Sequence, residues 1–385
     1  MKNSLSNKAL IKIMVILVAL AVVVSVFAVG MRWLSLKSSD HLLDEYVVTD
    51  NILTEREHML VGWCLGNSLD SIIYRKGESV SYYETAWGNP VTTKDMIDKV
   101  KQSGFNAVRV PVTWNDHMDE NGTVDTDWLD RVEEVVSYVL DNDMICILNV
   151  HHDTGETAWI KADYSRIEEN KDGVSSLWRQ IAERFRDYDH RLVFEGLNEM
   201  LNNSNQWTDA SYDDYIAVNE LNRTFVETVR NTGGKNQNRY LIVNTYAAST
   251  DFKALAMFVM PNDTVKNRLI AEVHFYFNDT SSTDDMLKRV KSRFIDNNIN
   301  VIIGEFGMKG DPSNENSVSE RRYYAQYFVT KCREAGVMGC FCWDDGGTFS
   351  DAQSINNYAM LDRTNCQWYD QRLVDTIMSS ATAHQ

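Results

Sequence analysis

Eight short apolar runs recur along the chain, and segments with helical periodicity separate them. The runs have the length and bulk of buried strands, and they are residues 60–66, 107–112, 144–151, 192–198, 240–246, 269–276, 301–306 and 339–343. Between them, residues 93–103, 128–140 and 318–335 place apolar side chains on one face of a helix. Strands that alternate with helices eight times predict an α/β protein with a (β/α)8 TIM barrel.

A doubly wound open sheet is the main alternative to the barrel. That fold should carry a glycine-rich phosphate loop after its first strand, and none follows residue 66. No linker rich in proline, serine or glycine interrupts the chain after residue 53. We therefore expect residues 53–385 to form one barrel domain, which is an ordinary size for this fold.

The N-terminus carries the only targeting signal that the sequence shows. Lys2, Lys8 and Lys12 precede an apolar run that extends over residues 13–31. A run this long can span a bilayer, so residues 1–34 are predicted to be a transmembrane signal anchor, with a cleaved signal peptide as the alternative. Residues 35–52 would be a polar stalk. Either reading predicts an extracytoplasmic domain, with the membrane as a partner if the segment is kept.

Charge and cysteine usage narrow the classes of partner. The formal net charge is −17, so the chain repels phosphate backbones and no nucleic-acid partner is expected. A neutral polysaccharide meets no such objection. The six cysteines form no CxxC pair and no dense framework, and a bridge from Cys332 to Cys342 or to Cys366 is left open.

Polar side chains stand at or near the ends of most of the predicted strands. Active sites in TIM barrels lie at the carboxyl ends of the strands, and buried charges destabilise a fold unless partners surround them. The residues at this rim are Arg109, His151, His152, Asn198, Glu199, His274, Tyr276, Glu305 and Trp343. Because adjacent strand residues point to opposite sides, only one of His151 and His152 is expected to enter the pocket.

Two of these residues, Glu199 and Glu305, suggest a specific chemistry. They end the fourth strand and interrupt the seventh, which face each other across an eight-stranded barrel. Glycoside hydrolysis needs two carboxyl groups, and a retaining enzyme holds them about 5–5.5 Å apart. Glu199 is the expected acid, and Glu305, beside Arg109, the expected ionised nucleophile. A zinc site would need a third ligand such as His274, and the sequence has no HExxH or comparable spacing. Neither a metal nor another cofactor is therefore predicted.

The motifs around these residues resemble glycoside hydrolase family 5, the cellulase-type family. The resemblance lies in segments 62–70 (GWCLGNSLD), 84–90 (ETAWGNP), 104–114 (GFNAVRVPVTW), 198–199 (NE), 274–276 (HFY) and 303–307 (IGEFG). It covers nearly the whole predicted domain. The family's usual activity, hydrolysis of β-1,4-linked glucans, is therefore the expected activity.

The resemblance implies roles for individual residues. Glu199 would be the acid/base and Glu305 the nucleophile of an endo-acting, retaining hydrolase. The central subsite would be formed by Arg109, His151, Asn198, His274, Tyr276 and Trp343. Neighbouring subsites would take substrate contacts from Trp63, Asn67, Trp87, Trp114, His117, His152 and Trp207, for which ordinary packing is the alternative.

Two departures from the family pattern affect the groove more than the chemistry. Met200 stands where proline usually follows the acid/base, and Cys64 stands where asparagine is common. Specificity for mannan or xyloglucan, or a catalytically silent glucan-binding barrel, are the alternatives. Loops 202–211 and 278–285 would decide among the substrates.

Overall fold

The barrel of the computed structural model has eight parallel strands, each hydrogen-bonded to its neighbours in chain order, and β8 closes onto β1. The structure describes residues 59–276, 279–307, 309–311, 314–347 and 358–382. The strands are β1 (Leu60–Leu65), β2 (Ala107–Val110), β3 (Ile145–Asn149), β4 (Leu192–Glu195), β5 (Leu241–Asn244), β6 (Leu269–Tyr276), β7 (Val301–Gly307) and β8 (Gly339–Asp344). The predicted barrel is thus confirmed, and the open sheet is excluded.

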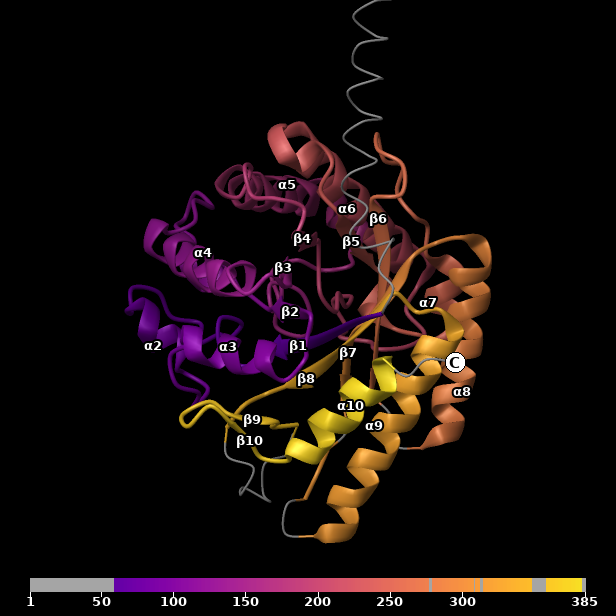
Figure 1. Cartoon of the computed structure of the whole chain (residues 1–385). Helices are drawn as coiled ribbons and strands as arrows, with labels where there is room; N and C mark the ends of the chain where they lie inside the picture. Colours follow the sequence, from indigo (N-terminus) through magenta and orange to yellow (C-terminus); the bar gives the residue numbers. More distant parts are fainter. Residues whose placement is uncertain (1–58, 277–278, 308, 312–313, 348–357, 383–385) are drawn as a thin grey trace, which may run out of the picture. The chain divides into compact units, whose positions relative to one another are not determined.

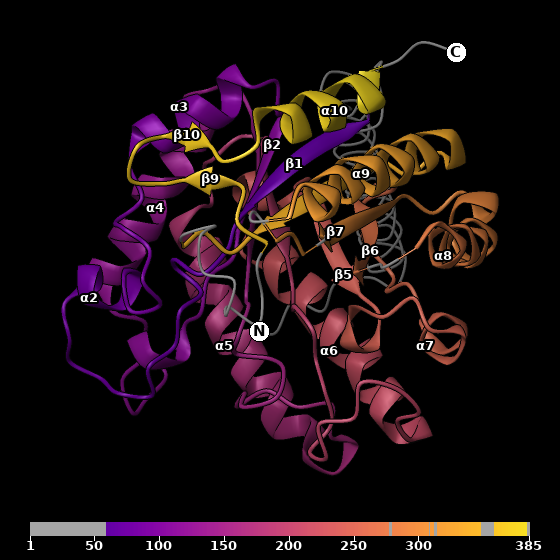
Figure 2. The same ribbon diagram turned by 90° about the horizontal axis from the view of Figure 1, so that it is seen from below.

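Helices surround the strands (Figure 1). They are α2 (Val80–Glu84), α3 (Lys94–Gln102), α4 (Thr126–Leu140), α5 (Ile167–Arg184), α6 (Tyr212–Asn231), α7 (Phe252–Met257), α8 (Thr280–Arg293), α9 (Glu315–Ala335) and α10 (Gln371–Thr382). Short 3-10 turns are η1 (Asn115–His117), η2 (Tyr164–Arg166), η3 (Gly234–Gln237), η4 (Tyr246–Ala248) and η5 (Ile295–Asn297). Figure 2 shows α10 beside α9, and a small hairpin of β9 (Leu361–Asp362) and β10 (Gln367–Trp368) precedes it.

Capping residues set the ends of the longer helices. Ser211 and Asp214 form a reciprocal capping box at the start of α6. Asn314 accepts two backbone N–H bonds at the start of α9, and Gly336 ends that helix with a left-handed φ of 86°. These local signals fix where each helix meets the barrel.

The strands alternate between two buried environments. Outward side chains such as Val108, Val110 and Leu148 join the hydrophobic layer between strands and helices. Inward side chains on the same strands include Arg109 and Asn149, which are also fully buried. The strand period of two therefore places polar groups inside the barrel without breaking the apolar layer.

The predictions on disulfides and on the N-terminal anchor concern different parts of the chain. All six cysteines are free, so neither candidate disulfide is formed. No helix among the described segments is long and apolar enough to cross a bilayer. The predicted anchor and stalk, residues 1–52, lie outside the described residues.

Candidate active site

Glu305 lies on β7 inside the mouth of the barrel and is held by two donors. Arg109 donates from Nη1 to its Oε1 at 2.7 Å, and the Tyr276 hydroxyl donates to its Oε2 at 2.6 Å. Burial alone would raise the pKa of Glu305, but the charges of His274 and Arg109 and the Tyr276 bond outweigh it and lower the pKa. Glu305 is therefore ionised at neutral pH, as a nucleophile must be.

Glu199, just after β4, has a different environment. Its side chain keeps 23% of its surface exposed, and its Oε1 lies 2.8 Å from Nδ1 of His274. Glu199, His274 and Glu305 each place one polar atom within 4.8 Å of the others. That spacing is shorter than the roughly 6.5–9.5 Å of inverting glycosidases and fits a retaining pair.

Two further glutamates, Glu195 and Glu272, lie close to Arg109 inside the barrel, and neither was predicted from the sequence as a site residue. Arg109 donates from Nε and Nη2 to both carboxylate oxygens of Glu195, at 2.6 and 2.7 Å, and its Nε lies 3.6 Å from Glu272. Both glutamates are fully buried, on β4 and β6. A charged residue in the middle of an otherwise apolar run was the available signal for each of them.

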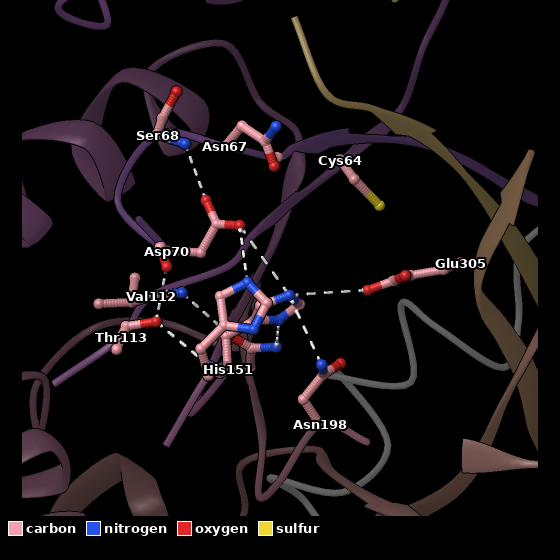
Figure 3. A network of polar contacts seen from close by, with 12 residues as sticks. Cys64, Asn67, Ser68, Asp70, Val112, Thr113, His151, Asn198 and Glu305 are labelled. Atoms are coloured by element: carbon pink, nitrogen blue, oxygen red, sulfur yellow. Dashed lines mark hydrogen bonds and ion pairs between the residues drawn. The ribbon is translucent and has the colours of Figure 1, made fainter. Parts of the chain in front are cut away.

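His151 is the histidine of its pair that enters the barrel mouth, as Figure 3 shows. Its Nδ1 lies 3.0 Å from the Asn149 amide nitrogen, and that amide cannot turn round because its oxygen accepts from Val112 and its nitrogen also donates to Glu195. Nδ1 is thus an acceptor, and Nε2 carries the proton. Burial and nearby positive charges lower the pKa of His151, so the ring is neutral.

His152 also reaches Asp70, and its ring lies edge-on to that of His151 with centroids 4.5 Å apart. Its Nε2 lies 3.6 Å from Asp70 Oδ2, and its ring packs against Trp87. Burial opposes the charged form of His152, but Asp70 outweighs burial and raises the pKa.

Two groups among the described residues have the composition of a metal site. One is Asp70, His151 and His152; the other is Glu199, His274 and Glu305. In the first, the protonated Nε2 of His151 has no lone pair to offer. In the second, burial opposes the charge on His274, but the surrounding glutamates raise its pKa to about 10, so this ring is protonated as well. In both groups an imidazole nitrogen therefore carries a proton that it would have to lose before it could bind a metal.

The remaining central residues also converge on the barrel mouth. Asn198 accepts from Arg109 Nη2 at 2.9 Å. The Trp343 ring stacks parallel to His151, with centroids 5.6 Å apart, and covers Gly66 so closely that a Cβ there would lie 2.6 Å from it. The structure thus brings together all eight residues predicted for the catalytic pair and the central subsite.

The outer candidates divide into exposed and buried groups. Trp87 and Trp207 are 39% and 45% exposed, and Trp207 donates to Glu156 at 3.1 Å. Asn67 is partly exposed near Asp70 and adopts a left-handed φ of 57°. These three residues and His152 keep surface that a ligand can reach.

Trp63, Trp114 and His117 are not placed to contact substrate, so these three predictions are corrected. Both tryptophans are fully buried, and their indole nitrogens donate to Asp344 and to the Asn149 carbonyl. His117 stacks on Trp128 at 3.5 Å between centroids, and burial lowers its pKa to about 3. Packing explains all three.

The departures Cys64 and Met200 are both buried. Cys64 points into the barrel, where its Sγ contacts the Gly304 carbonyl at 3.4 Å. The Met200 carbonyl accepts from Ala247, so the exit of β4 is tied to η4. Neither side chain has the exposed surface that a substrate contact requires.

The family model for cellulase (glycosyl hydrolase family 5) matches residues 73–347, which include both glutamates and most of the barrel. The chain belongs to glycosyl hydrolase family 5. Two family relatives are endoglucanase A of Clostridium longisporum, 36% identical over 345 residues, and a cellulase/esterase of Acetivibrio thermocellus, 37% identical over 342 residues. These alignments cover 84% and 83% of this chain but only 64% and 39% of the relatives.

A solved family 5 structure is also similar. A mutant enzyme from Prevotella bryantii, in complex with a xyloglucan tetradecasaccharide, superposes with a TM-score of 0.77 at 35% identity. The match covers 84% of this chain and 96% of that one. Family 5 membership thus agrees with both the barrel and the sequence motifs.

Proposed function

We propose that the chain is a retaining, endo-acting hydrolase of β-1,4-glucan, either cellulose-like or mixed-linkage. One observation carries the proposal: Glu199 and Glu305 have oxygens within 4.8 Å of each other and opposite surroundings. Glu305 is buried and bound by Arg109, which cannot give up its proton, whereas Glu199 is partly exposed and bonded to His274, which can.

The proposed reaction has two displacements. Glu305 attacks the anomeric carbon while Glu199 protonates the departing glycosidic oxygen, which leaves a covalent glycosyl–enzyme. Water then attacks that carbon, Glu199 accepts a proton from the water, and Glu305 leaves as a carboxylate. The sugar keeps its β configuration because it is inverted twice.

The surrounding groups would support these steps. Arg109 and Tyr276 hold Glu305 in the orientation for attack, which lowers the entropy cost of reaction. Asn198 would bind the hydroxyl next to the reacting carbon, and Trp343 would form an apolar floor for the ring.

Product stereochemistry tests the mechanism directly. Early proton NMR of the hydrolysate should show mainly the β anomer, and an initial excess of the α anomer would rule out retention.

Glu305→Gln and Glu199→Gln should each reduce turnover by several orders of magnitude in folded protein. Wild-type turnover in either variant would refute the assignment of the pair.

Xyloglucan is a second candidate substrate. The Prevotella bryantii relative was solved with a xyloglucan oligosaccharide, and Trp87 and Trp207 provide exposed aromatic faces on this chain. Initial rates on carboxymethylcellulose, lichenan, xyloglucan and mannan would rank these substrates. Binding without hydrolysis of any of them would instead identify a silent glucan-binding barrel.

For the N-terminus, we propose an uncleaved anchor over residues 1–34 that holds the domain outside the cytoplasm. The support is the long apolar run after Lys2, Lys8 and Lys12. Fractionation of expressing cells should recover the full-length chain with membranes. Release of a chain that begins near residue 31 would favour the cleaved alternative.

A further inference from the structure

Glu272 is a carboxylate buried inside the barrel with no catalytic assignment. It is fully buried on β6, where Asn244 donates to its Oε2 at 3.1 Å. Among the described residues, neither its Oε1 nor the nearby His274 Nε2 has a hydrogen-bond partner. Burying a charge this way is costly, so the site must compensate for it elsewhere.

The neighbouring backbone is shaped to accept this side chain. A Cβ at Gly304 would lie 1.4 Å from Glu272 Oε1, so only glycine at this position of β7 leaves room for the carboxylate. Oε1 lies 3.5 Å from His274 Nε2 and 3.6 Å from Arg109 Nε. Glu272 and His274 are two residues apart on one strand and face the same interior.

His274 therefore stands between two carboxylates. Its Nδ1 faces Glu199 at 2.8 Å, and its Nε2 faces Glu272 at 3.5 Å. Glu305 on β7 and His151, just after β3, also act on His274. Arg109, which pairs with Glu305 and Glu272, and Tyr276, which donates to Glu305, lie one contact further away. Glu272 faces Nε2, whereas the contacts of His274 with Glu199 and Glu305 are made through Nδ1.

We infer that Glu272 is a positioning residue: it keeps one proton of His274 on Nε2 and leaves Nδ1 as the nitrogen that exchanges a proton with Glu199. A carboxylate behind a catalytic histidine fixes its tautomer and stabilises its charged form in the same way in serine hydrolases. The inference rests on the proposed function, because it gives Glu199 its acid/base role.

The proton balance follows from the geometry. In one form His274 carries both protons and Glu199 is ionised. Transfer of the Nδ1 proton to Glu199 Oε1 gives neutral His274, still protonated on Nε2, and a carboxylic acid ready to protonate the glycosidic oxygen. When Glu199 later takes a proton from water, the reverse transfer restores the first form. One proton is therefore shared between the two groups.

Glu272→Gln tests this role, because it removes the charge and keeps the shape. Loss of a negative charge this close should make the pair release its proton roughly 1–3 pH units lower, so the basic limb of the kcat/KM profile moves down by that amount. The acidic limb should move less, since Arg109 and Tyr276 still bind Glu305. Glu272→Asp, which retains a charge, should restore part of the shift.

A spectroscopic readout separates this role from a purely structural one. In protein labelled with 15N-histidine, with His274 assigned by its loss in His274→Gln, the wild-type ring should keep both protons well above pH 7, given its pKa of about 10. In Glu272→Gln it should lose the Nδ1 proton at lower pH and keep the Nε2 proton. An unchanged His274 titration would overturn the inference.

Glu84→Gln is the matched control. Glu84 is equally buried but is bound by Arg131, on α4 outside the barrel. This variant controls for loss of a buried charge and should leave both pH limbs in place, whatever its stability. If wild-type protein hydrolyses no β-glucan, the proposed function fails, while the 15N titration still reports whether Glu272 controls His274.

Discussion

The two faces of the barrel strands are equally buried and chemically opposite. On the outer face, Trp178 is fully buried, packs against Phe194 and Phe225, and donates its indole N–H to the Gly196 carbonyl. On the inner face, Arg109 and Glu195 are also fully buried, but they form a charged network. The outer and inner faces of the strands therefore differ in the kind of side chain that is buried, and not in how much is buried.

The difference separates stability from chemistry. Apolar area removed from water stabilises the fold by about 25 cal/mol per Å², whereas buried ion pairs often contribute little net stability. The outer layer thus supplies the free energy that allows the inner face to hold unfavourable charges in fixed positions. Variants on the two faces should affect different measurements.

Arg109→Met should have the largest effect. It leaves Glu195, Glu272 and Glu305 without their shared cation, and removal of one partner of a buried pair costs roughly 3–5 kcal/mol. Turnover should also fall by about 100-fold or more, because the nucleophile loses its positioning donor. Urea unfolding and kcat on β-glucan measure the two losses. Arg109→Lys is the control, since it keeps the charge but not the forked geometry.

An Arg109→Met protein with wild-type turnover would break the comparison. It would mean that the inner network serves the fold and not the reaction. Recovery of most stability but little activity in Arg109→Lys would instead strengthen the division between the two faces.

Trp178→Ala should have the second largest effect, on stability alone. Truncating a buried tryptophan costs about 3–5 kcal/mol through lost burial and the cavity left behind. The kcat of the folded fraction should stay close to wild type, because Trp178 lies on α5 and packs against the outer side of β4, away from the inner face. Trp178→Phe, which loses mainly the bond to Gly196, should cost less. A large fall in kcat at temperatures where the variant is folded would contradict this separation.

The outer face was easier to predict from sequence than the inner one. All eight apolar runs became strands, although run 192–198 forms a strand only through Glu195 and run 144–151 only through Asn149. The rim residues that follow leave the ladder and turn toward the site. An apolar run indicates which residues are buried. The hydrogen bonding of the strand can stop several residues before the buried segment ends.

To predict which side of a strand a residue faces, one needs the register of the strands in the barrel, which the sequence does not show. Cys64 pairs with Arg109 and Trp343 and points inward, so its neighbour Trp63 points outward and is buried there, with Arg363 over its ring. Glu195 and Glu272 were missed because an apolar run does not say what a charge within it will face. Their partners come from other strands, far away in the sequence.

Glu195→Gln should have a smaller effect that depends on pH. Burial outweighs Arg109 and, with Glu272 nearby, raises the pKa of Glu195 from 4.5 to about 7. Between these values the folded state binds more protons than the unfolded state, so wild-type stability falls as pH rises. The variant lacks this fall, so its free energy of unfolding relative to wild type should improve by up to about 3 kcal/mol across that window.

Urea unfolding at several pH values measures this change, and Glu305→Gln provides a control of opposite sign. The pKa of Glu305 is lowered, so its contribution to stability is present above pH 4.5 and is lost as pH falls through its folded pKa. Parallel pH profiles for Glu195→Gln and wild type would show that Glu195 is ionised throughout and that the inner charges are fully compensated.

Trp207→Ala should have the smallest effect, because Trp207 belongs to neither buried face. It is 45% exposed and donates a hydrogen bond to the exposed side chain of Glu156, so its removal should change stability by less than about 0.5 kcal/mol. If its ring stacks on a sugar, KM should rise by roughly 3–10-fold with kcat nearly constant, as expected when binding energy common to ground and transition states is lost.

Trp207→Phe should bring KM most of the way back to the wild-type value, since stacking needs the flat face and not the indole nitrogen. Tyr323→Ala, an exposed aromatic on α9, should change neither constant. An equal loss of kcat in Trp207→Ala would extend the catalytic region beyond the barrel mouth to the loop after β4.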